Sequence, residues 1–66
     1  MTTLEIYNER AARCRHEAAL AVLANVKERC IRSALAWEGM ADQLRVTEAY
    51  RANEAVRKAE LALAFE

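Results

Sequence analysis

Three side chains of this 66-residue sequence could bind a soft metal ion or act as nucleophiles, namely Cys14, His16 and Cys30. Zinc requires three or four ligands that converge at about 2.0–2.3 Å. On a helix, Cys14 and His16 would point to nearly opposite sides because they lie two residues apart. They therefore could not share a metal within one helix, and we expect neither a metal site nor a cofactor.

Other catalytic patterns are missing from the sequence. It contains no glycine-rich phosphate loop, no Ser/His/Asp set and no pair of carboxylates in a plausible pocket. We therefore expect a non-enzymatic protein. The two cysteines are expected to be thiols in a reducing compartment, and a thiol-based sensor that uses Cys14 and Cys30 stays a second alternative.

A basic cluster suggests a different alternative, a nucleic-acid-binding regulatory helical dimer. Its members are Arg10, Arg13, Arg15, Arg29 and Arg32. Glutamates are interleaved with these arginines at helical pairing distances, so a solvated face of ion pairs is the simpler interpretation. The net charge of zero also gives no general attraction to nucleic acid or anionic lipid.

The elements that carry these residues are predicted to be long helices. Proline is absent, glycine occurs once, and alanine, leucine, glutamate and arginine dominate. Thr2 and Glu5 have the spacing of a capping box, which predicts a first helix over about residues 3–23. Asn25 and Glu28 repeat that spacing, which predicts a turn at about 23–25 and a second helix over about 26–64. A single unbroken helix is the alternative at this turn.

Each predicted helix carries a seam of small and apolar residues at steps of three and four. In the first helix the seam is Leu4, Tyr7, Ala11, Cys14, Ala18 and Ala21. In the second helix it is Cys30, Ala34, Trp37, Ala41 and Leu44. Folding the chain at the turn brings the seams together, with Ala11 leaving room for the indole of Trp37. The sequence therefore predicts an antiparallel helical hairpin.

Such a hairpin leaves apolar residues without a cover, and these are the predicted interface. They are Leu20, Leu23, Ile31, Leu35, Val56, Leu63 and Phe65. The last three belong to a segment, residues 47–66, that has no partner within the hairpin. We expect an all-α chain with a long second helix that dimerises into a four-helix bundle. A bend near residues 45–47 that returns a third helix, giving a three-helix bundle, is the alternative.

Several of these residues occur in a pattern similar to that of short bacterial proteins of unknown function. The pattern consists of Tyr7, the Arg-Ala pair at 10–11, the turn sequence at 23–29, and Trp37 followed by Met40 and Ala41. It covers about residues 5–50, with Lys27 at a place where the pattern has arginine. The resemblance implies a small helical protein of the cytoplasm, and it implies no activity and no site residue.

The sequence thus predicts a small non-enzymatic helical oligomerisation or protein-interaction protein. A homodimer is the expected assembly, and a further protein partner is possible. The amino terminus lacks a signal peptide, and no apolar run approaches the roughly 20 residues that span a bilayer. We therefore expect a cytoplasmic protein without a membrane or nucleic-acid partner.

Overall fold

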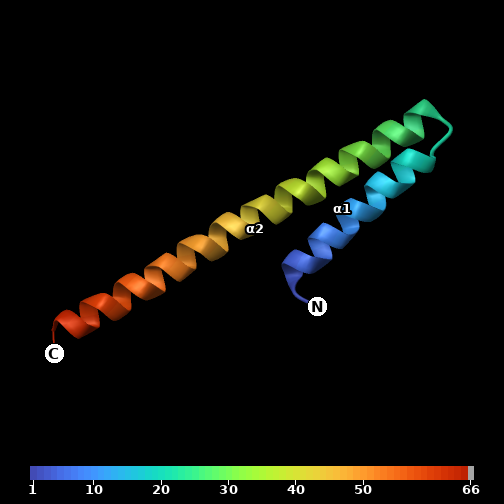
Figure 1. Ribbon diagram of the computed structural model, residues 1–66. Helices are drawn as coiled ribbons and strands as arrows, with labels where there is room; N and C mark the ends of the chain where they lie inside the picture. The colour runs from blue at the N-terminus through green and yellow to red at the C-terminus, as the bar shows by residue number, and fades with distance from the viewer. Residues whose placement is uncertain (66) are drawn as a thin grey trace.

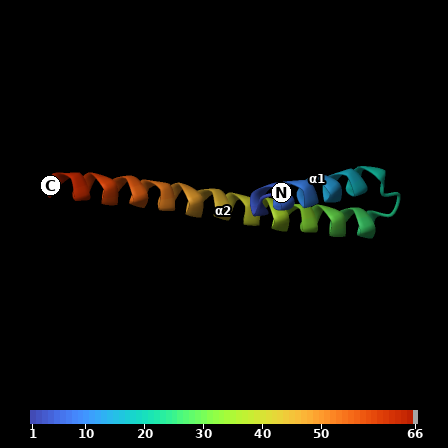
Figure 2. The ribbon, with the colours of Figure 1, turned by 90° about the horizontal axis from the view of Figure 1, so that it is seen from below.

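The computed structural model describes residues 1–65, which form two α-helices joined by a short turn. The first helix, α1, spans Thr3–Leu20, and the second, α2, spans Ala24–Ala64. The helices lie side by side and antiparallel, and α2 continues far beyond the amino terminus of α1 (Figures 1 and 2). The prediction of an all-helical hairpin with a long second helix is confirmed. Because α2 passes through residues 45–47 without a break, no third helix folds back.

The amino terminus of α1 is fixed by the capping box that Thr2 and Glu5 form. The backbone N–H of Glu5 donates to the Thr2 hydroxyl at 3.1 Å, and the backbone N–H of Thr2 donates to the Glu5 carboxylate at 3.0 Å. These bonds satisfy two of the N–H groups that the first turn of a helix leaves without an acceptor. The cap therefore sets the point at which α1 begins.

Thr2→Ala is expected to lower the free energy of unfolding by about 1 kcal/mol, because alanine cannot accept the bond from the Glu5 N–H. Thr3→Ala is the matched control, since Thr3 is the first exposed residue inside α1 and caps nothing. Urea unfolding followed by circular dichroism measures both variants at one protein concentration. Equal stability of the two variants would contradict a role for the cap.

The turn lies earlier in the chain than the sequence predicts, and Asn25 does not cap α2. α1 ends at Leu20 rather than near residue 23, and Leu23 is the cap residue of α2, without a side-chain hydrogen bond to the helix. The early turn lets Ala21 and Val26 become half-buried between the two helix ends. An asparagine cap contributes about 1 kcal/mol, and half-burial of the valine side chain contributes a stabilisation of about the same size.

The two seams meet as predicted. Every seam residue of either helix is buried or half-buried. The buried ones are four alanines, Ala11, Ala18, Ala34 and Ala41, and among residues 1–65 no large side chain is fully buried. Since alanine has only a methyl group, the helices can approach closely, but they remove little apolar surface from water.

The second half of α2 has no neighbour in the chain. Residues 48–64, which we call the arm, are exposed apart from the half-buried Glu54. They follow the hairpin in a straight line (Figure 2), and the molecule measures 65 × 19 × 11 Å along its principal axes. The chain is therefore a thin rod, one half of it two helices wide and the other half a single helix.

Candidate interaction surfaces

The arm carries several exposed large apolar side chains. Val56 is 57% exposed, Leu63 is 70% exposed, and Phe65 just beyond the helix is 86% exposed. Tyr50 and Leu61 are exposed as well. Single exposed apolar residues are normal on proteins, but a row of them on an unpaired helix is typical of an interface.

The four predicted interface residues of the hairpin do not form one patch. Leu20 ends α1 and Leu23 begins α2, so both lie at the turn beside Val22, which is 96% exposed. We call these three residues the tip. Leu35 is exposed more than two helical turns away along α2, and Ile31 is half-buried beside it. The structure therefore divides the predicted flank into a tip and a pair on the side of α2.

An aromatic cluster closes one edge of the hairpin. The rings of Tyr7 and Trp37 lie with their centroids 5.6 Å apart at an angle of 39°. The guanidinium of Arg10 lies 5.1 Å from the centroid of the indole, within the range of a cation–π interaction. Trp37 thus contacts two side chains of α1 and joins the helices, although it is half-buried and lies outside the alanine core.

Polar contacts join the opposite edge. The Arg15 guanidinium donates two hydrogen bonds of 2.7 Å to the carboxylate of Glu38. Near the amino terminus of α1, Arg45 donates to the Asn8 side chain at 3.2 Å and to Asp42 at 2.6 Å. The bidentate geometry between Arg15 and Glu38 is the strongest kind of arginine–carboxylate contact, and it fixes the register of the helices on this edge.

The hydrogen bonds from Arg15 lower the pKa of Glu38 below its ordinary value of 4.5. A carboxyl with a lowered pKa in the folded state stabilises that state above the unfolded pKa, and the stabilisation is lost as pH falls through the folded pKa. We therefore expect part of the hairpin stability to disappear on acidification below about pH 4.5. In Glu38→Gln that part should be absent at every pH, so the stability difference from the wild type should shrink in acid. Urea unfolding across this pH range measures the difference, and a difference that is constant with pH would contradict the assignment.

The basic cluster is partly neutralised within the chain. Arg13 lies 3.7 Å from the Glu9 carboxylate, Arg15 pairs with Glu38, and Arg10 lies over Trp37. Arg29 and Arg32 are exposed on α2. Two of the five arginines are therefore paired with a carboxylate, and this pairing reduces the excess positive charge that the face could offer to a phosphate backbone.

The three candidate ligand side chains do not come together in the described part of the chain. Cys14 and Cys30 are half-buried free thiols in the seams, and His16 is exposed. Residues 1–65 contain no group of three or more potential ligands that could hold a metal ion. The arrangement of these side chains therefore gives no support to metal-dependent chemistry.

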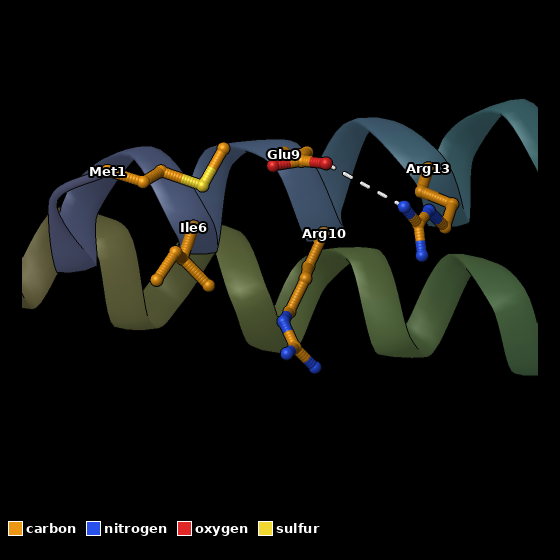
Figure 3. A pocket seen from close by; sticks show the side chains of 5 residues that line it. All are labelled: Met1, Ile6, Glu9, Arg10 and Arg13. Carbon is orange, nitrogen blue, oxygen red and sulfur yellow. Dashed lines mark ion pairs between the residues drawn. The ribbon is translucent and has the colours of Figure 1, made fainter.

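A shallow depression lies on the outer side of α1, between its amino terminus and its middle. It is lined by Met1, Ile6, Glu9, Arg10 and Arg13 (Figure 3). The only carboxylate among these five residues is the one that pairs with Arg13. The depression therefore offers an apolar floor and fixed charges, but no nucleophile and no acid–base pair.

Comparisons with protein-family models, with characterised proteins and with solved structures found no match to this chain. The resemblance to short bacterial helical proteins therefore stays a prediction. Within residues 1–65, neither helix is both long and apolar enough to cross a membrane. The function has to be inferred from the surfaces described above.

Proposed function

We propose that this protein is a non-enzymatic helical oligomerisation module whose assembled form is a homodimer of four helices. The observation that carries the proposal is the large exposed surface. The chain exposes 5472 Å², whereas a compact folded monomer of 7.5 kDa exposes about 4,200 Å². About 1,200 Å² of each chain is therefore surface that a compact fold of this mass would bury.

This excess has the size that a stable dimer requires. Two chains that each covered it would bury about 2,400 Å² in total, and obligate homodimers bury about 2,000–5,000 Å². A second copy also supplies the right chemistry, because it brings the same exposed Val56, Leu63 and Leu35. In a symmetric pair, each chain can thus cover the exposed apolar residues of the other chain without any other partner.

The composition of the core supports the same conclusion. Only four methyl side chains, Ala11, Ala18, Ala34 and Ala41, are buried, and each buried methyl group contributes about 0.8 kcal/mol. Ordering a residue costs about 1–2 kcal/mol of backbone entropy, so the lone hairpin has little stability in reserve. Burial of the arm in an assembly would supply the missing apolar contacts.

Sedimentation equilibrium and light scattering at micromolar concentration test the proposal. A mass of about 15 kDa, twice that of the chain, is expected. Dilution should reduce the helix content together with the mass, because the arm loses its cover when the dimer dissociates. A helical monomer of 7.5 kDa that stays folded over the whole range would overturn the proposal.

A further inference from the structure

A second stripe of residues runs along α2 next to the seam that faces α1. Its members follow one another at steps of three and four, one residue later than those of the seam. They are Ile31, Leu35, Glu38, Asp42, Arg45, Ala49, Ala52, Val56, Ala59 and Leu63. A shift of one residue turns a helix by about 100°. The stripe therefore lies along one side of the hairpin and continues without interruption onto the arm.

The polar contacts show which side this is. Glu38 and Arg45 belong to the stripe, and they contact Arg15 and Asn8 of α1. Ala12 and Ala19 lie on the same edge of α1 as these partners, since they continue the steps of three and four, and both are exposed. A helix laid along the stripe would thus lie beside small residues of α1 as well as on α2.

The arm and α1 have nearly the same length. The arm has 17 residues, from 48 to 64, and α1 has 18. At a rise of about 1.5 Å per residue, each is about 26 Å long. A second copy of α2 can therefore lie antiparallel to the first, with the two-fold axis near Thr47. The arm of each copy then lies along the hairpin of the other.

In this register four of the five layers combine residues of different size. The layers, with the partner residue second, are Ile31 with Leu63, Leu35 with Ala59, Glu38 with Val56, Asp42 with Ala52, and Arg45 with Ala49. Three layers place a larger side chain against an alanine, as interdigitated packing requires. The exposed Leu35 is covered in this arrangement, and so are the exposed Val56 and Leu63.

Charge separates the antiparallel pairing from a parallel one. A parallel pair would bring Glu38, Asp42 and Arg45 each opposite its own copy, so that like charges met at the centre of the interface. The antiparallel pair brings these residues opposite valine and alanine. It also brings the exposed Arg32 opposite the partner's Glu60. These two residues carry opposite charges, and each of them follows a residue of the stripe by one position.

Gly39 also follows a residue of the stripe, Glu38, by one position. A Cβ atom at Gly39 would meet nothing within 4 Å, and the residue has no positive φ angle, so the chain alone does not require a glycine. Glycine nevertheless lowers helix stability relative to alanine. In the antiparallel register Gly39 lies opposite the partner's Asn53, about halfway between the two-fold axis and the end of the paired segment, where a glycine lets two helices approach closely.

We propose that two copies pair through the second stripe in antiparallel register, so that the arm of each chain covers Ile31 and Leu35 of the other. This inference rests on the proposed dimer and specifies its interface. The two-fold axis passes near Thr47, and Val46 of one chain lies next to its own copy. The occupant of the exposed side of the hairpin is thus the arm of a second copy.

Distances between spin labels test the geometry. Val46→Cys and Glu60→Cys are each made in a Cys14→Ala/Cys30→Ala background and labelled with a nitroxide. The labels at residue 46 should be close, because packed helix axes lie about 8–10 Å apart. The labels at residue 60 should be about 40 Å apart along the axis. A short distance at residue 60, or a long one at residue 46, would overturn the antiparallel register.

A charge exchange tests the same register with both native cysteines in place. Arg32→Glu and Glu60→Arg should each raise the dimer dissociation constant by up to about tenfold, since the symmetry repeats the pair. The double variant should return to within about twofold of the wild type, because it restores opposite charges. Failure of this rescue would contradict the register. A wild type without any dimer would instead contradict the proposed function, so the two failures are distinguishable.

Discussion

Ala34→Leu is expected to separate α1 from α2. Ala34 is 0% exposed and lies in the seam between the helices, which approach closely because the buried residues are alanines. Leucine adds three heavy atoms where no space exists, and overpacking of this kind costs about 1–3 kcal/mol. In a hairpin with four buried alanines, that is a large share of the total stability.

Ala36→Leu provides a matched control for this substitution. It makes the same exchange two residues later on the same helix, but Ala36 is exposed, so its effect should stay within about 0.5 kcal/mol. Urea unfolding of both variants, followed by circular dichroism and by Trp37 fluorescence at one concentration, measures the contrast. Equal stability of the two leucine variants would show that the alanine seam does not hold the helices together.

The double substitution Val56→Glu/Leu63→Glu is expected to dissociate the dimer. Both side chains are exposed in the single chain, at 57% and 70%, and both lie on the stripe of the arm. Burial of a valine or leucine side chain contributes about 1.5–3 kcal/mol. Loss of both should raise the dissociation constant at least about 100-fold, since about 1.4 kcal/mol corresponds to a factor of ten.

Val22→Glu is the control for the arm variant. It also replaces an apolar side chain by a carboxylate, but at the turn, where Val22 is 96% exposed and lies outside the stripe. The dimer should keep its affinity in this variant. Sedimentation equilibrium measures all three proteins, and an arm variant that remains as dimeric as the wild type would argue against the arm as an interface.

The helical periodicity of the sequence was sufficient to predict the hairpin and its seam. Residues such as Ala11, Ala34 and Ala41 recur at steps that a helix places on one face, and pairing of the two seams buries them. The amino terminus of α1 was equally predictable, because the Thr2–Glu5 capping box is a local interaction. Local rules therefore describe the parts of the fold that neighbouring residues determine.

The turn could not be predicted in the same way. Asn25 and Glu28 have the spacing of a capping box, yet Leu23 begins α2 without a side-chain cap. The position of the turn depends on how Ala21 and Val26 pack between two helices, and a local sequence pattern does not contain that information. For the same reason Leu20 and Leu23 were grouped with Ile31 and Leu35, although the early turn places the first two at the tip.

The ion pair between Arg15 and Glu38 was also not predicted, because the two residues lie 23 positions apart and meet only when the helices pair. The sequence does place Arg15 directly after a residue of the first seam and Glu38 directly after a residue of the second seam. This placement was the available sign of a contact between them. Charges along the chain predict the basic cluster, whereas the ion pair of Arg15 across the hairpin reduces the charge that remains available.

The tip, formed by Leu20, Val22 and Leu23, has a consequence for valency. In the proposed dimer the arm of the partner ends before it reaches the turn, so both tips stay uncovered, one at each end of the rod. A target with two apolar pockets at the same spacing as the two tips would bind both tips. Binding of the first tip would give the second one a high effective concentration at its pocket. The length of α2 would then determine which targets bind both tips, according to the distance between their two apolar pockets.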